Sequence, residues 1–214
     1  MKSDSNNFEL GKINRRALLQ LAVASAALGI GFNQVSAKGL RVVVAGAGIV
    51  GASIAYHLAK AGAAVTVVDQ EGPATHASRG TFAWINATWA KQPRHYHAFN
   101  QDGLSGWKDL QQALKIPIRW QGSLEWYEQA QRQEKLKQQI REQVAWGERA
   151  RFVSSHELAL LEPQVNFRGA RNVAYSENDG AVDPVVATNA LLQAASSYGA
   201  TIKYPCTLND VILR

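Results

Sequence analysis

Residues 40–69 constrain the fold of this chain more than any other part of the sequence. An apolar stretch, Leu40-Arg-Val-Val-Val-Ala45, leads into Gly46-Ala-Gly48-Ile-Val-Gly51. An Ala-rich segment runs from there to about Lys60, and a second apolar stretch, Ala64-Val-Thr-Val-Val-Asp69, ends on a carboxylate. The pattern predicts strand, glycine turn, helix and strand, which is the βαβ opening of a doubly wound parallel sheet.

The spacing of the three glycines predicts a binding site for an adenine dinucleotide. Gly46 allows a tight turn out of the strand, Gly48 leaves room for a pyrophosphate, and Gly51 lets the helix approach the sheet. The helix N-terminus offers N–H groups and a partial positive charge to the phosphates. Asp69 ends the second strand, where a carboxylate accepts hydrogen bonds from ribose hydroxyls. The alternative is a chance glycine turn in another kind of α/β domain.

Charge and cysteine content exclude several other classes of protein. The formal net charge of the 214 residues is +6, of which residues 1–37 carry +2, and no long basic run marks a nucleic-acid surface. Cys206 is the single cysteine, so neither an intrachain disulfide nor a CxxC site can form. The five histidines show no HxxxH spacing, and we expect no protein metal site.

The N-terminus is similar to a twin-arginine export signal over residues 1–37. Arg15 and Arg16 precede an apolar run from Ala17 to Phe32, and Val35-Ser36-Ala37 supplies the small residues of a cleavage site. We therefore expect a periplasmic protein that meets the membrane only through this signal; an uncleaved anchor or a fortuitous helix is the alternative. The route carries folded proteins, which favours a tightly bound cofactor such as FAD over an exchangeable one such as NAD.

Hydrophobic periodicity and turn residues predict the order of the remaining elements. We expect a loop-rich segment over 71–90, helices at 97–115, 129–144, 157–161 and 184–198, and strands within 116–128 and at 200–204 and 211–213.

The same patterns predict an environment for several side chains. Val50, Ile54 and Leu58 should line the apolar face of the first helix, with Tyr56 facing solvent or packing on the sheet. The charged face of 129–148 should be solvated. The remaining expectations are surface positions for His95, His97 and His156, core or flavin-side positions for Trp84 and Trp89, and a buried Cys206.

Four segments resemble the FAD-dependent oxidoreductases of the D-amino-acid oxidase, glycine oxidase and sarcosine oxidase type. They are Arg41–Gly62 with Val65–Asp69, then Ala77-Ser-Arg-Gly-Thr-Phe-Ala-Trp-Ile-Asn-Ala87, Leu161-Glu-Pro163, and Gly180-Ala-Val-Asp-Pro184 with Gly199-Ala-Thr-Ile202. The resemblance covers about residues 39–214. It implies a dinucleotide-binding part at 39–90 and part of an α+β substrate domain at 91–180, within an oxidoreductase domain at 38–214.

The resemblance implies FAD as cofactor and assigns a set of residues to it, while the catalytic residues stay unidentified. Ile49 and Val50 would lie beside the pyrophosphate. Arg79 would meet a phosphate or a substrate carboxylate, or lie on the surface, and His76 would be a solvated loop residue or a point of covalent flavin attachment. The implied cofactor-binding residues are Gly46, Gly48, Ile49, Val50, Gly51, Asp69, Gln70, Ala77, Ser78, Arg79, Phe82, Ala83 and Trp84.

The implied chemistry is oxidation of an amino acid or secondary amine at the carbon beside nitrogen, with reoxidation by oxygen or an electron carrier. Members of the family are longer than 214 residues, so we expect an N-terminal part of the family, either from a truncated reading frame or as one half of a split enzyme. A C-terminal half or an electron acceptor is then the expected partner. A non-catalytic nucleotide-binding subunit is the second interpretation. An NAD-dependent dehydrogenase is the third, although it would leave 77–87 and 180–184 without a role.

Overall fold

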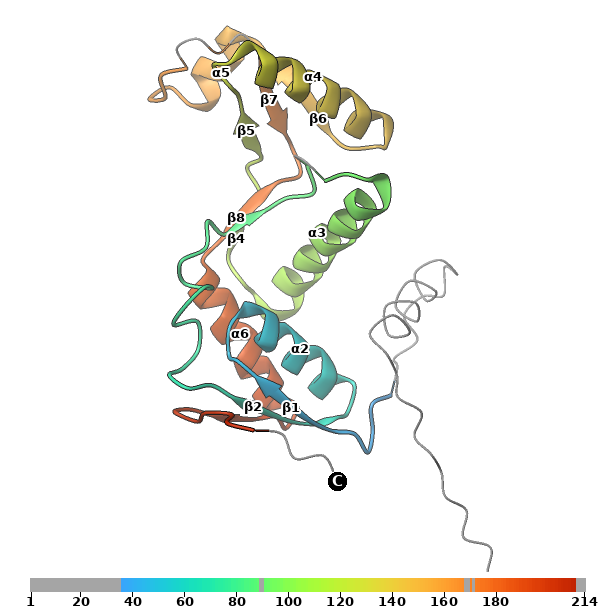
Figure 1. Ribbon diagram of the computed structural model, residues 1–214, viewed down its shortest axis with the longest axis vertical. Coiled ribbons are helices and arrows are strands. Elements are labelled where there is room, and N and C mark those ends of the chain that lie inside the picture. The colour runs from blue at the N-terminus through green and yellow to red at the C-terminus, as the bar shows by residue number, and fades with distance from the viewer. Residues whose placement is uncertain (1–35, 89–90, 168–169, 171, 211–214) are drawn as a thin grey trace, which may run out of the picture. The chain divides into compact units, whose positions relative to one another are not determined.

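The computed structural model of the protein describes residues 36–88, 91–167, 170 and 172–210. The chain divides into a segment Met1–Ser36 and a unit Ala37–Arg214, and every described helix and strand belongs to the second unit (Figure 1). Residues 1–35 of the predicted export signal, with Arg15 and Arg16, lie outside the described residues, as do Trp89 and the strand expected at 211–213. Within the described ranges, no helix has the length and apolar character needed to cross a membrane.

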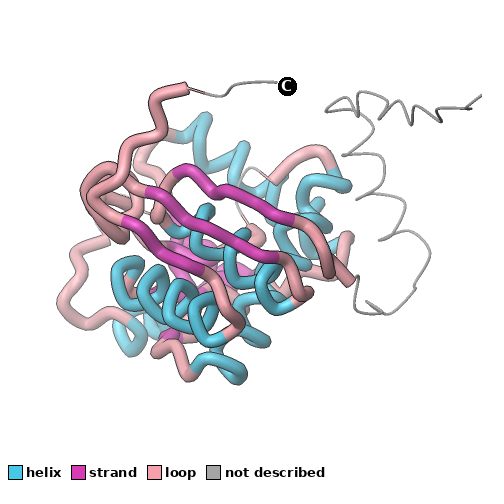
Figure 2. The backbone as a smooth tube through the Cα atoms, turned by 90° about the horizontal axis from the view of Figure 1, so that it is seen from below, coloured by secondary structure: helices cyan, strands magenta, loops and turns pink. Residues whose placement is uncertain are grey.

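The glycine turn belongs to a parallel sheet of three strands in the order β1-β2-β9. Strand β1 (Arg41–Ala45) leads through helix α2 (Ile49–Lys60) into β2 (Ala64–Val68), as the sequence predicts. Strand β9 (Thr201–Lys203) pairs with the other edge of β2. Helix α6 (Pro184–Ser197) precedes β9 and lies with α2 on one side of the sheet, so that the strands lie in front of the helices in Figure 2.

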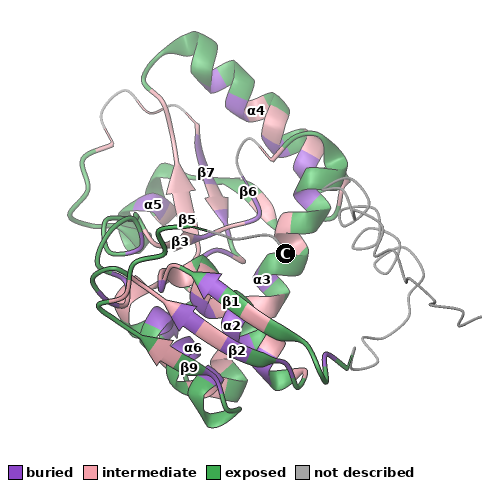
Figure 3. Cartoon of the chain, turned by 60° about the horizontal axis from the view of Figure 1, so that its bottom comes forward, coloured by how far each residue is buried: buried purple, intermediate pink, exposed green. Residues whose placement is uncertain are grey.

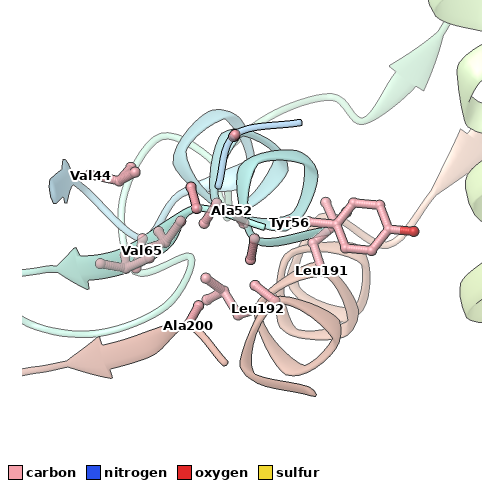
Figure 4. Close-up of a cluster of buried hydrophobic side chains, with 14 residues drawn as sticks. Val44, Ala52, Tyr56, Val65, Leu191, Leu192 and Ala200 are labelled. Atoms are coloured by element: carbon pink, nitrogen blue, oxygen red, sulfur yellow. The ribbon is translucent and has the colours of Figure 1, made fainter. Parts of the chain in front are cut away.

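The main core fills the space between this sheet and the two helices (Figure 4). The side that α2 buries is made of small residues and one ring: Ala52, Ala55, Tyr56 and Ala59. The expected apolar face is wrong, because Val50 and Ile54 are 71% and 46% exposed. Alanines let the helix lie close to the sheet and to α6, whereas a row of larger side chains would hold it away.

The opposite face of the parallel sheet is open to solvent in the described part of the chain. Side chains alternate along β1, so that Val44 is buried and Val43 is 62% exposed. Thr66 of β2 and Thr201 of β9 are register neighbours of Val43 in this exposed row.

Two antiparallel sheets are formed by the residues between β2 and β9. The first has the order β3-β8-β4, from Trp84–Ile85, Gly180–Val182 and Ile118–Arg119. The second has the order β5-β7-β6, from Ser123–Glu125, Val173–Ser176 and Ala150–Val153. The remaining helices are α3 (Arg94–Leu114), α4 (Ala130–Ala145) and α5 (Ser155–Leu161). The sequence predicts the three helices but not β3, β6, β7 or β8, which have two to four residues each and too short an alternation to read.

Helix α4 carries exposed residues along its outer side and buried positions beneath (Figure 3). Its buried side includes Gln133 and Gln143 beside Leu136 and Ile140. The expectation of a solvated charged face is wrong for Glu148, which is buried.

Candidate cofactor-binding site

The turn after β1 requires glycine at two positions for different reasons. Gly46 has φ +107°, a conformation that L side chains rarely adopt, and its N–H donates to the carbonyl of Val68 at 2.8 Å. A Cβ on Gly51 would lie 2.0 Å from the Gly46 carbonyl oxygen. The helix can therefore approach the turn this closely only because residue 51 has no side chain. This geometry agrees with the structural roles predicted for both glycines, a tight turn at Gly46 and a close approach at Gly51.

The N-terminus of α2 is covered by a side chain from another segment. Gly48 is the N-cap residue and has no side chain to bond the first turn. Instead, the Ile49 N–H donates to the Ser78 hydroxyl oxygen at 2.9 Å. The Ser78 hydroxyl keeps its own hydrogen to donate elsewhere, and Val50 beside it is exposed. The structure thus gathers Gly48, Ile49, Val50 and Ser78 at one helix end, where anions bind well.

Asp69 organises the turn through backbone hydrogen bonds. One carboxylate oxygen, Oδ2, accepts from the Ala47 N–H at 2.8 Å. The other, Oδ1, accepts from Glu71 N–H at 2.9 Å and Gly72 N–H at 2.8 Å. A carboxylate offers about four acceptor positions, so Oδ2 retains capacity for a ribose hydroxyl.

The environment keeps the Asp69 carboxylate ionised. Burial by itself would raise its pKa, but the N–H groups of Ala47, Glu71 and Gly72 and the nearby His76 lower the pKa below its ordinary value. His76 lies in the exposed loop and pairs with Glu71 at 3.0 Å. An ionised Asp69 accepts hydrogen bonds only, which suits a partner that brings hydroxyl groups.

A pocket of about 220 Å³ opens at the carboxyl ends of β1 and β2. Gly46, Asp69 and the predicted Gln70 line it from one side, and Cys206–Leu208 line it from the other. The Cys206 N–H donates to the Asp69 carbonyl at 2.7 Å, and the cysteine is half-buried rather than buried as expected. The sequence did not predict that Cys206–Leu208 line the site, because β9, which precedes them, pairs with β2 from more than a hundred residues further along the chain.

The other implied flavin residues lie further along the same segment. Ala77 and Arg79 are exposed. Phe82 is 87% exposed, and its ring lies 6.2 Å from that of Trp84, with which β3 begins. The residue between them, Ala83, has φ +58°. The structure therefore brings Ser78 to the glycine turn but places 82–84 at the β3–β8 pairing, and their contact with flavin stays a prediction.

A buried polar cluster was not foreseen in the sequence. His97 is 1% exposed, which corrects the expected surface position, and it packs against Trp146 with ring centroids 5.4 Å apart. Its Nε2 lies 3.5 Å from the buried Glu148 carboxylate. Asp179, between β7 and β8, is fully buried as well. The Asn178-Asp179-Gly180 sequence is typical of an exposed turn, so no local signal marked this carboxylate.

The fold and this site define a class of protein, a dinucleotide-binding α/β protein with an additional antiparallel part. The glycine cradle, the N-terminus of α2 with the Ser78 hydroxyl beside it, and the acceptor on Asp69 fit the diphosphate and ribose of an adenine dinucleotide. Residues 41–214 match the family described as FAD dependent oxidoreductase, and the chain belongs to this family. The cofactor of the family is FAD.

Individual relatives agree with this membership. Over 172 residues the chain is 27% identical to the mitochondrial dimethylglycine dehydrogenase of Mus musculus, covering 79% of this chain and 20% of that protein. Over 186 residues it is 28% identical to the 4-methylaminobutanoate oxidase (formaldehyde-forming) of Paenarthrobacter nicotinovorans, covering 81% of this chain and 21% of that protein.

Solved structures show the same fold. Glycine oxidase from Bacillus cereus ATCC 14579 superposes with a TM-score of 0.74 at 21% identity, over 82% of this chain and 48% of that one. The chain thus spans about a fifth of the dehydrogenase and of the methylaminobutanoate oxidase, and about half of the glycine oxidase.

Proposed function

We propose that the chain binds FAD at the glycine turn and serves in the oxidation of a small amino acid or amine at the carbon beside nitrogen. The observation that carries the proposal is the assembly at one helix end of the Gly46–Gly51 cradle, the Ser78 hydroxyl and the ionised Asp69, in a member of an FAD-dependent family.

Each part of the site has a separate task in this proposal. The N–H groups at the start of α2 and the helix dipole attract the diphosphate, and Ser78 can donate its hydroxyl hydrogen there while accepting from Ile49. Asp69 accepts from a ribose hydroxyl with the remaining capacity of Oδ2. When bound, FAD supplies the redox chemistry of the family, acceptance of a hydride from the substrate carbon.

The proposed substrate class comes from what the relatives are named for. Dimethylglycine dehydrogenase, 4-methylaminobutanoate oxidase and glycine oxidase are all named for small amino acids, two of them N-methylated. We propose a substrate of this class, with an electron-acceptor protein as partner.

Binding of FAD is tested by fluorescence titration of the purified chain, followed by the visible spectrum after desalting. We expect saturation at one FAD per chain and colour that survives desalting. Gly48→Val should weaken binding at least about a hundredfold, because the added side chain enters the space of the pyrophosphate and of Ser78, whose Oγ would be 2.9 Å from the new Cβ. Gly103→Val is the matched control, since a Cβ at Gly103 of α3 meets nothing within 4 Å.

Two results would contradict the site: no FAD bound by the wild-type chain, or equal affinity in Gly48→Val and Gly103→Val. Displacement of FAD by excess NAD would favour the plain dehydrogenase instead. If FAD binds, glycine, N-methyl amino acids and D-amino acids are screened for bleaching of the flavin absorbance, with an artificial dye as acceptor. A substrate identified this way tests the reaction separately from the cofactor.

We also propose export of the folded chain to the periplasm. The support is the sequence of residues 1–37 alone, with Arg15 and Arg16 ahead of the apolar run.

A further inference from the structure

The buried carboxylate of Asp179 is the hub of a hydrogen-bond cluster outside the glycine turn. Its side chain is 0% exposed. The Oδ2 atom accepts from Trp84 Nε1 at 3.1 Å, Thr88 Oγ1 at 3.0 Å and Ser123 Oγ at 2.7 Å. The Oδ1 atom has no hydrogen-bond partner in the described part of the chain. Three donors on one oxygen are the arrangement that favours an ionised carboxylate.

Two of these donors, Trp84 and Thr88, bond Asp179 at either end of the short strand β3. Trp84 is its first residue, and Thr88 follows its last residue, Ile85, by three positions. The strand has only two residues and pairs with β8 through Trp84↔Ala181 and Ile85↔Gly180. Pairing over only two residues stabilises the position of a segment weakly. The hydrogen bonds of Trp84 and Thr88 to Asp179 therefore contribute much of what keeps 84–88 in place.

The residues just before β3 depend on this hold. Ala83 adopts φ +58°, which is uncommon for a residue other than glycine and persists only where the surroundings impose it. The Ala83 carbonyl accepts from the Val182 N–H at 3.3 Å, so the imposed conformation is tied to β8. Phe82, the residue before Ala83, is 87% exposed and belongs to the stretch that the family resemblance assigns to the flavin.

No cation balances the charge of Asp179 among the described groups that face it. Trp84, Thr88 and Ser123 are neutral donors, and the charged neighbour is Glu148, from the turn between α4 and β6. Burial and this neighbour raise the pKa of Asp179 to about 6, despite the three donors.

Glu148, the charged neighbour of Asp179, also contacts residues of α3. Its carboxylate accepts from Gln101 Nε2 and Asn178 Nδ2, both at 3.2 Å, and lies 3.5 Å from His97 Nε2. No three His, Cys, Asp or Glu side chains of the described residues are gathered closely enough to hold a metal ion.

We propose that Asp179 is a positioning residue whose ionised carboxylate holds the segment Phe82–Thr88 in the conformation that meets the flavin, a role that rests on the proposed binding of FAD. Ionised, the carboxylate accepts charge-assisted bonds from Trp84 and Thr88. Protonation leaves a neutral acceptor with bonds about half as strong. Acidification then loosens 82–88 without touching the glycine turn.

The first experiment uses the full chain without FAD. Tryptophan fluorescence is titrated from pH 4.5 to 8 in the wild type, in Trp84→Phe, in Asp179→Asn and in the double variant, because subtracting each Trp84→Phe curve isolates Trp84 from the other five tryptophans. We expect a Trp84 transition with a midpoint near pH 6 in the wild type and a flat curve with Asp179→Asn. A flat wild-type curve, or the same transition in Asp179→Asn, overturns the proposal.

Two further variants keep the test decisive. Asp183→Asn is the matched control at the other end of β8. Asp183 is exposed and caps α6 through Oδ1, and asparagine caps equally well, so the Trp84 transition should persist. If Asp179→Asn does not fold, Thr88→Val removes one donor and leaves the carboxylate. The midpoint should then move to higher pH, and an unchanged midpoint overturns the proposal.

The second experiment measures the FAD dissociation constant at pH 8 and pH 5. We expect wild type and Asp183→Asn to bind about tenfold more weakly at pH 5, and Asp179→Asn to bind weakly at both, since about tenfold is what one lost hydrogen bond costs. Equal affinity in wild type and Asp179→Asn overturns the positioning role. Failure of every protein to bind FAD refutes the proposed function, while the cofactor-free titration still decides whether Asp179 holds the segment.

Discussion

At the scale of single residues, the fold gives two aspartates opposite acid–base properties. Burial would raise the pKa of Asp69, but the N–H groups of Ala47, Glu71 and Gly72 lower it below its ordinary value. Burial raises the pKa of Asp179 to about 6, and its hydroxyl and indole donors offset only part of the effect. Backbone N–H groups bonded to both oxygens of Asp69 thus favour its ionised form. The side-chain donors on one oxygen of Asp179 do not suffice to offset the effect of burial on its pKa.

Asp69→Ala should therefore destabilise the chain in a pH-dependent manner. A carboxylate whose folded pKa lies below its unfolded value adds stability above the unfolded pKa and loses it as pH falls through the folded pKa. We expect a loss of about 1–3 kcal/mol in the free energy of unfolding at pH 7, shrinking below pH 4. Urea denaturation at several pH values measures it.

The control for this prediction is Asp102→Ala, at an exposed position of α3. A constant difference between Asp69→Ala and wild type from pH 7 to pH 3 would show that the hydrogen bonds of Asp69 do not depend on its charge.

At the scale of elements, the pair α2–α6 supports the glycine turn from behind. Leu191 of α6 is 1% exposed in the core that α2 shares. Leu191→Ala should cost about 2–4 kcal/mol of unfolding free energy, because it leaves a cavity between the helices. Val186→Ala, at a position 43% exposed on the same helix, should cost less than about 1 kcal/mol.

Thermal unfolding and FAD titration together check this expectation. The melting temperature of Leu191→Ala should fall while its FAD affinity, measured well below that temperature, stays near the wild-type value. A loss of affinity in the folded variant would mean that α6 shapes the site as well as stabilising it.

The elements that sequence reasoning found are those with local causes. The βαβ unit follows from its glycines, and α6 begins where Asp183 caps it, its Oδ1 accepting from Val185 and Val186 N–H at 2.8 and 3.0 Å. Strands β3 and β8 were missed because residues far apart in the chain form their pairing, as Trp84 does with Ala181.

The same distinction applies within the site. The roles of Gly46 and Gly51 could be predicted because a motif fixes them at short range. The position of Ser78 came from family resemblance alone, since nothing near it in the sequence indicates the bond to Ile49. Asp179 could not be found, because its burial results from Trp84, Thr88 and Ser123, which lie 95, 91 and 56 positions away.

At the scale of the whole molecule, residues 1–37 predict where in the cell the protein is located. Replacing both Arg15 and Arg16 with lysine should leave the protein in the cytoplasm, because a twin-arginine address is read by its receptor and the compact ammonium of lysine does not reproduce the guanidinium fork. Cell fractionation measures the location, and Lys12→Arg serves as the charge-neutral control. Export of the double-lysine protein at the wild-type level would reject this address.

The pairing of α2 with α6 also determines when the protein can fold. Residues 69–183 separate β2 from α6 and are roughly ten times as long as a short loop. Bringing α6 back to the sheet therefore costs about 2 kcal/mol more free energy, through lost chain entropy, than closing a short loop. On the ribosome, Ala52, Ala55 and Tyr56 stay uncovered until α6 has been synthesised. A chaperone that shields this stretch of the nascent chain would therefore act on the part that later holds the nucleotide.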